Sequence, residues 1–194
     1  MSIDKEIQKL LKSAAESFGN GLEEYWPVIN PDQNSLKETN LTFQFGAQCL
    51  SHGMKIYPEA SDADASQGHK RVDLLVKGKF EEQNFFLIVE SKRLYSTEKA
   101  REIVADYERI NTFTFLEDHR SNSGNPFRAK KHGLLLALTT SQEYADWWKE
   151  PTEYDQGGCW DQLMDVLNSA TSKGYHLIET TRPQYFLFAF FENC

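Results

Sequence analysis

Apolar residues recur every three or four positions in several parts of the chain, the spacing that predicts amphipathic helices. Such stripes predict helices over residues 2–18, 35–52, 97–110, 142–149 and 159–172. The stripe of the second helix consists of Leu36, Asn40, Phe43, Ala47 and Leu50. Gly19, Gly53 and Gly174 are expected to end three of these helices, because glycine is common just past a helix C-terminus. Residues 20–34 contain two prolines and are expected to connect the first two helices.

Shorter apolar runs without helical spacing predict strands. They cover residues 54–57, 71–76, 85–89, 134–138, 175–180 and 184–191. Pro58 is expected to end the first strand, and the polar residues 59–69 to form a loop. The run 85–89 is apolar throughout, which is typical of a strand buried on both faces. The predicted order is α, α, β, β, β, α, β, α, α, β, β, which favours an α/β sandwich on a mixed sheet.

Length and composition favour one globular domain. The chain has 194 residues, of which 40% are hydrophobic and 13% aromatic. Its net charge of −8 argues against a simple nucleic-acid coat protein, which would usually be basic. The three cysteines form no C-x-x-C pair, no apolar run is long enough to span a bilayer, and the N-terminal residues lack the apolar core of a signal peptide. A cytoplasmic protein without membrane contact is therefore expected.

Two carboxylates and a lysine are expected to meet at the end of neighbouring strands. Asp73 lies in the strand 71–76, and sixteen residues separate it from Glu90, which follows the run 85–89. Alternate strand residues share a face, so Glu90 and Lys92 project together and Ser91 points away. Asp73 and Glu90 could ligate Mg²⁺, with the Ser91 backbone carbonyl as a further oxygen. Lys92 could orient or deprotonate the attacking water in phosphodiester hydrolysis. A strand-end salt bridge without chemistry is the alternative interpretation.

This layout resembles the PD-(D/E)xK nuclease superfamily, which has the restriction-endonuclease-like fold. Residues 35–138 match its α-β-β-β-α-β core, with an acidic residue on the second strand and E-x-K on the third. The resemblance implies that Asp73 and Glu90 are metal ligands and that Lys92 is the catalytic lysine. Val72 stands where the family often has proline. On this division residues 1–34 form an N-terminal helix and connector, residues 35–138 the nuclease-like core with its three-layer arrangement, and residues 139–194 a C-terminal extension packed on the core.

Many relatives carry a glutamate on the first core helix, and Glu38 is its match. The resemblance therefore adds Glu38 to the expected catalytic residues. Ser35 and Glu38 also have the S-x-x-E spacing of a capping box, in which Glu38 would instead bond the Ser35 amide. Both roles are compatible only if the first helical turn lies at the site.

Basic residues near the expected site are candidates for binding phosphates. Two clusters are predicted to contact nucleic acid, with plain solvated surface as the alternative for each: Lys70, Arg71, Lys92 and Arg93, and Arg128, Lys130, Lys131 and His132. The helix after E-x-K often contacts substrate in the family, which makes Lys99, Arg101 and Arg109 further candidates. For Asp106 and Arg109, i,i+3 pairing on a solvated face is the favoured interpretation. The histidines lack ligand spacing, and His119 and His132 are taken as surface residues.

The predicted function is an Mg²⁺-dependent nuclease, endo- or exonucleolytic, for which Mn²⁺ can substitute. DNA is favoured over RNA, in defence, restriction or repair. The alternative is a non-catalytic nuclease-fold module that binds nucleic acid or serves as a partner subunit. The aromatic strand 184–191 is either a homodimer face or ordinary core, and Trp147, Trp148 and Trp160 are expected to be buried rather than to stack on bases.

Overall fold

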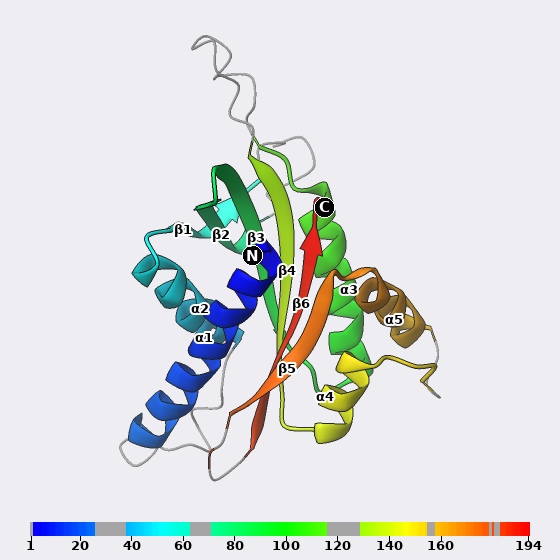
Figure 1. The fold of residues 1–194 in the computed structure, drawn as a ribbon. Coiled ribbons are helices and arrows are strands. Elements are labelled where there is room, and N and C mark those ends of the chain that lie inside the picture. Colours follow the sequence, from blue (N-terminus) through cyan, green and yellow to red (C-terminus); the bar gives the residue numbers. More distant parts are fainter. Residues whose placement is uncertain are drawn as a thin grey trace.

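The chain folds into a six-stranded mixed sheet covered by helices on both faces (Figure 1). The computed structural model describes residues 2–25, 38–62, 71–115, 129–154, 158–178, 180 and 183–194. The five helices in these ranges are α1 (Ile3–Tyr25), α2 (Glu38–Ser51), α3 (Thr97–Thr112), α4 (Gln142–Lys149) and α5 (Cys159–Ser169). The strands are β1 (Lys55–Ser61), β2 (Arg71–Phe80), β3 (Gln83–Arg93), β4 (Lys130–Thr139), β5 (Ser172–Ile178) and β6 (Gln184–Glu192). The predicted order of elements is therefore confirmed.

The strands lie in the order β1-β2-β3-β4-β6-β5. All neighbours are antiparallel except β3 and β4, which are parallel. A parallel pair needs a crossover, and α3 supplies it between β3 and β4. The predicted α/β class with a mixed sheet is confirmed, and the C-terminal strands β6 and β5 extend this sheet beyond β4.

The sheet separates two hydrophobic clusters. In Figure 1, α1 and α2 cover one face of the sheet, and α3, α4 and α5 cover the other. The first cluster contains Phe45 of α2 and Phe186, Phe188 and Phe190 of β6. The second contains Trp147, Trp148 and Trp160, whose predicted burial is confirmed. The phenylalanine run of β6 is thus core, whereas the homodimer stays a prediction.

The α2 stripe that predicted this helix is not its packed face. The buried residues are Leu41, Phe45, Gly46 and Cys49, whereas Phe43, Ala47 and Leu50 are exposed. A helix apolar on both sides gives two candidate stripes, and only packing against α1 and the sheet selects between them. Leu36 of the predicted stripe lies outside the described residues, as does Ser35 of the proposed capping box.

Three helix or strand ends that were predicted at a glycine or a proline were wrong. Helix α1 continues through Gly19, where an added Cβ would lie 3.0 Å from Cγ2 of Ile178, so the close packing of α1 on β5 favours glycine there. Strand β1 continues through Pro58, because an edge strand tolerates a residue without an N–H. Gly174 lies inside β5 rather than after α5, and an added Cβ there would meet the ring of Phe188.

No helix in the described ranges has the combined length and apolar character that crossing a bilayer requires.

Candidate functional site

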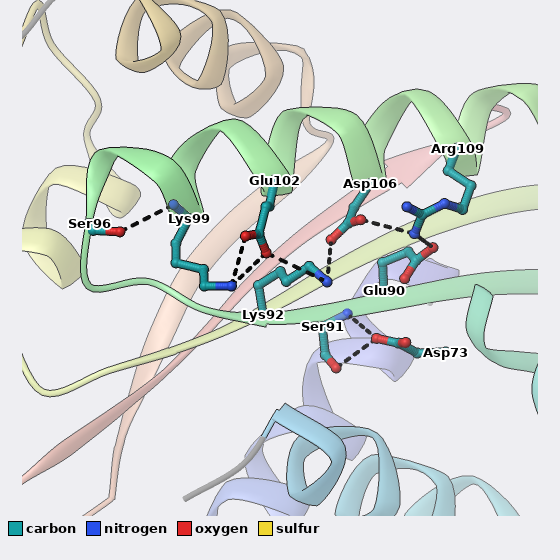
Figure 2. Close-up of polar contacts among 9 residues, drawn as sticks. All are labelled: Asp73, Glu90, Ser91, Lys92, Ser96, Lys99, Glu102, Asp106 and Arg109. Atoms are coloured by element: carbon teal, nitrogen blue, oxygen red, sulfur yellow. Dashed lines mark hydrogen bonds and ion pairs between the residues drawn. The ribbon is translucent and has the colours of Figure 1, made fainter. Parts of the chain in front are cut away.

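Glu90 and Lys92 both project from β3 toward α3, as their alternation predicted (Figure 2). Glu90 is 1% exposed, and its Oε1 accepts a hydrogen bond from Nη1 of Arg109 at 2.6 Å. Nζ of Lys92 lies 3.6 Å from Oδ2 of Asp106 and 4.0 Å from Oε2 of Glu102. The two charged residues of the E-x-K pattern, Glu90 and Lys92, are therefore both held by side chains of the crossover helix α3.

Four charged side chains of α3 face Glu90 and Lys92 of β3: Lys99, Glu102, Asp106 and Arg109. Arg109 Nη1 also bonds Oδ1 of Asp106 at 2.9 Å, and Lys99 Nζ bonds both carboxylate oxygens of Glu102 at 2.8 and 2.7 Å. The result is one chain of ion pairs, Lys99–Glu102–Lys92–Asp106–Arg109–Glu90 (Figure 2). We call these six residues the ion-pair chain.

Asp106 was not singled out as a site residue from the sequence. Its i,i+3 pairing with Arg109 is confirmed, but the prediction of a solvated face was wrong, because Asp106 is 2% exposed. Asp106 lies on the buried side of α3 together with Ile103 and Ile110. An acidic residue within an apolar helical stripe is the sequence signal that marks it, since such a residue needs partners when buried.

Asp73 lies on the other side of β3 from the ion-pair chain. Its Oδ2 accepts hydrogen bonds from the backbone N–H of Ser91 at 2.8 Å and from the Ser91 hydroxyl at 2.9 Å. The Ser91 hydroxyl also lies 3.2 Å from the backbone carbonyl oxygen of Glu38. Figure 2 shows Ser91 and Asp73 together on the side of the strand opposite α3. The structure therefore brings Asp73 next to Ser91 and the first turn of α2.

This position of Asp73 follows from a break in strand alternation. Val72 and Leu74 are two residues apart, yet Val72 packs in the cluster on the α3 side and Leu74 in the cluster on the α2 side. On the neighbouring strand β1, Pro58 pairs with Leu74 and Ala60 pairs with Val72. Glu59, which lies between Pro58 and Ala60, has a positive φ of 52°. The paired register of β2 with β3 also stops at Leu74 and Val89, one position before Asp73. The Asp73 carboxylate thus bonds the Ser91 amide where the ladder ends.

The carboxylates at this end of the sheet influence one another strongly. The pKa of Glu90 is raised to about 8, first by burial and then by the negative charges of Asp106 and Asp73. The hydrogen bond and the charge of Arg109 lower this pKa by less. Burial likewise raises the pKa of Asp106 to about 6, against the lowering effect of Lys92 and Arg109. Oδ2 of Asp106 is buried and has no hydrogen-bond partner among the described residues. For Glu90 and Asp106, the effect of burial on the pKa is therefore larger than the opposing effect of the neighbouring cations.

Glu38 opens α2 and lies at the same end of the sheet. Its carbonyl oxygen is near Ser91, and its side chain is close enough to Lys99 to help raise the pKa of that lysine, after the larger effect of Glu102. The first turn of α2 is therefore at the site, which was the condition for a catalytic role of Glu38 beside a capping role.

The basic residues predicted to bind phosphates lie at two ends of the sheet. Arg71 and Arg93 lie near Asp73 and Lys92 at the site end. Lys130 and Lys131 begin β4, where Lys130 pairs with Phe85, five strand positions or about 16 Å from Glu90. Lys131 Nζ donates to the carbonyl of Asn111 at 2.8 Å. Lys70, Arg128 and His119 lie outside the described residues.

His132 was predicted at the surface, and this was wrong. It is 1% exposed between the rings of Phe85 and Phe190, and burial lowers its pKa to about 4.

The donor set suits a hard divalent cation in kind, because it consists of carboxylate oxygens. Asp73 Oδ1 and Glu90 Oε2 accept no hydrogen bond from the residues that the structure describes. Oδ2 of Asp106 has no hydrogen-bond partner among the described residues, although Nζ of Lys92 lies 3.6 Å from it. Over the same residues, no group of three or more His, Cys, Asp or Glu side chains is arranged to hold a metal ion. Two carboxylates from neighbouring strands are therefore the protein ligands on which a cation would depend.

Comparisons with models of protein families, with curated proteins and with solved structures gave no match to this chain.

Proposed function

We propose that this chain is a metal-dependent nuclease of the PD-(D/E)xK type, with a restriction-endonuclease-like core and DNA as the favoured substrate. One observation carries the proposal. Glu90 of β3 is buried next to Lys92 and Asp106, and burial together with the charges of Asp106 and Asp73 raises its pKa to about 8. Strongly perturbed titratable groups at strand ends are typical of functional sites.

In this proposal Asp73 and Glu90 hold Mg²⁺, which would lower the pKa of a bound water and offset charge on the phosphate. Ser91 fixes the Asp73 carboxylate through its amide and its hydroxyl. Arg109 fixes the Glu90 carboxylate from the opposite side. Asp106 lies between Lys92 and Arg109, so it orients the Lys92 ammonium group. Lys92 then positions the attacking water or takes its proton.

The proposal predicts metal-dependent cleavage by the purified wild-type protein. Duplex, single-stranded and branched DNA and an RNA are each incubated with Mg²⁺, with Mn²⁺ or with a chelator. We expect at least one substrate to be cut with metal and none to be cut with chelator, because the carboxylates alone do not activate water at neutral pH. Cleavage that persists in chelator would reject this assignment.

A non-catalytic nuclease-fold module is the second candidate. It is favoured by the ion pairs that Glu90 and Lys92 already make with Arg109 and Asp106 of α3. The ion-pair chain would then serve only to fasten the crossover helix to β3. Buried ion pairs of this kind do not by themselves require a ligand.

Thermal unfolding with and without metal separates the two candidates. A cation that binds only the folded protein stabilises it in proportion to occupancy, by about 2.7 kcal/mol at one hundred times Kd. We expect Mn²⁺ or Mg²⁺ to raise the Tm of the wild type, and Asp73→Asn to abolish the increase. Asp62→Asn is a matched control, because Asp62 lies just after β1 and bonds Thr114. An equal metal effect in wild type and Asp73→Asn would count against Asp73 as a ligand.

A further inference from the structure

Tyr95 is an exposed aromatic residue on a fixed backbone beside the proposed site. Its relative exposure is 55%, and it lies three residues after Lys92. The neighbouring Leu94 is fully buried and its N–H donates to the carbonyl of Leu138 at 2.8 Å. On the other side, Ser96 caps α3 by accepting a hydrogen bond from the Lys99 amide. The ring is therefore presented to solvent from a turn that is anchored at both ends.

Arg93 stacks on this ring. Its guanidinium carbon lies 5.3 Å from the ring centroid of Tyr95, within the range of a cation–π contact. Among the described residues, Arg93 makes no ion pair with a carboxylate. One ring face thus contacts a cation that remains available for a phosphate, and more than half of the residue stays open.

The segment around Tyr95 is basic although the chain is acidic. Residues 92–101 contain four basic side chains, Lys92, Arg93, Lys99 and Arg101, and one acidic side chain, Glu98. The whole chain, by contrast, has a net charge of −8. Lys92 and Lys99 are paired with Glu102 and Asp106, whereas Arg93 and Arg101 make no ion pair among the described residues. An exposed ring beside two such arginines is a combination that binds a base and its phosphates together.

We propose that Tyr95 and Arg93 form a stacking platform for one unpaired base of a single-stranded nucleic acid. The proposal rests on the proposed function, because the platform would position a strand whose phosphate reaches Lys92. Bases within a duplex are stacked on each other, so only an unpaired nucleotide offers a free face to the ring. Tyr95 supplies the stacking surface, and Arg93 and Arg101 contact the flanking phosphates. The substrate class is therefore a nucleic acid with a single-stranded segment.

Binding in a chelator tests the platform without cleavage. The probes are a fluorescent oligothymidylate, the corresponding oligouridylate and a blunt duplex, and Kd is measured by fluorescence anisotropy. We expect Tyr95→Ala to raise the Kd for a single-stranded probe about fivefold or more, the lower end of the loss for one base–aromatic stack. Tyr95→Phe should bind like the wild type, because stacking needs the ring and not the hydroxyl. Duplex binding should be the same in all variants.

Tyr57→Ala is the matched control. Tyr57 is also exposed, at 65%, but it lies on the edge strand β1 and has no stacked cation in the ranges that the structure describes. We expect this variant to bind every probe like the wild type. The two single-stranded probes also distinguish a DNA platform from an RNA platform.

The outcomes separate this proposal from the nuclease assignment. Equal single-stranded binding by wild type and Tyr95→Ala, or no binding by the wild type, would overturn the platform. Metal-dependent cleavage seen alongside either result would leave the nuclease standing. Weaker single-stranded binding by Tyr95→Ala, without cleavage under any condition, would support the platform and reject the nuclease.

Discussion

Cleavage by a Lys92→Ala protein is expected to fall about a thousandfold, within the range for loss of a positioned proton-transfer group. Lys92 is the cation that the E-x-K pattern places beside Glu90, and Asp106 and Glu102 hold its ammonium group at 3.6 and 4.0 Å. Its side chain is 21% exposed, so it is restrained and still open to solvent. The loss should appear in kcat, because Lys92 acts in the chemical step and contributes less to substrate binding.

Two control variants accompany this measurement. Lys79→Ala removes an exposed lysine near the C-terminal end of β2, where Lys79 pairs with Glu82, and should cut like the wild type. Lys92→Arg keeps the charge near Asp106 but not the readily deprotonated amine, and should remain strongly impaired. The Tm of each protein shows that it has folded. Full activity of folded Lys92→Ala would remove the nuclease assignment.

The metal-free protein is expected to lose stability as the pH rises from about 5 to about 8. The pKa of Glu90 is raised from 4.5 to about 8 in the folded protein, and that of Asp106 from 3.8 to about 6. Between these limits the folded protein binds more protons than the unfolded chain, so its free energy of unfolding falls with pH. Each pKa unit corresponds to about 1.4 kcal/mol, so Glu90 contributes a decrease of about 3–5 kcal/mol.

Glu90→Gln tests this expectation, because glutamine keeps the size of the side chain and does not ionise. Denaturant unfolding in chelator should show a much smaller decrease between pH 5 and pH 8 for this variant. Near pH 8 it should be more stable than the wild type. Glu108→Gln, an exposed position on α3, should retain the wild-type dependence. A Glu90→Gln protein that loses as much stability as the wild type would assign the pH dependence to other groups.

Elements with a strong local pattern could be predicted from the sequence. Strand β3 could be identified because a continuous apolar run has no helical period, and α4 because its apolar residues recur at helical spacing. The packed face of α2 could not be identified, because that choice depends on α1 and the sheet. The strand positions of Pro58 and Gly174 could not be predicted for a related reason. Proline is tolerated in β1 because β1 is an edge strand, and glycine fits in β5 because the ring of Phe188 faces it, and both facts depend on the assembled sheet.

The candidate site divides in the same way. Strand alternation was sufficient to place Glu90 and Lys92 on one face. It could not place Asp73, because the break in alternation between Val72 and Leu74 involves the backbone of a different strand, at Glu59. The burial of Asp106 could not be predicted from a local sequence pattern either. The helical spacing shows that Asp106 shares a side with Ile103, but only the crossover of α3 over β3 shows that Lys92 and Arg109 compensate its charge.

The contact between α1 and β5 has a consequence for the order of folding. The side chains of Asp4 and Ser172 are hydrogen-bonded although they lie 168 positions apart in the sequence, and Gly19 packs on Ile178. During synthesis α1 leaves the ribosome well before β5, since chains emerge from the N-terminus at about 5–20 residues per second. The part of α1 that faces β5 is therefore synthesised about ten seconds or more before its partner. Over that interval this surface is available to chaperones, and the contact of α1 with β5 closes a loop that spans most of the chain.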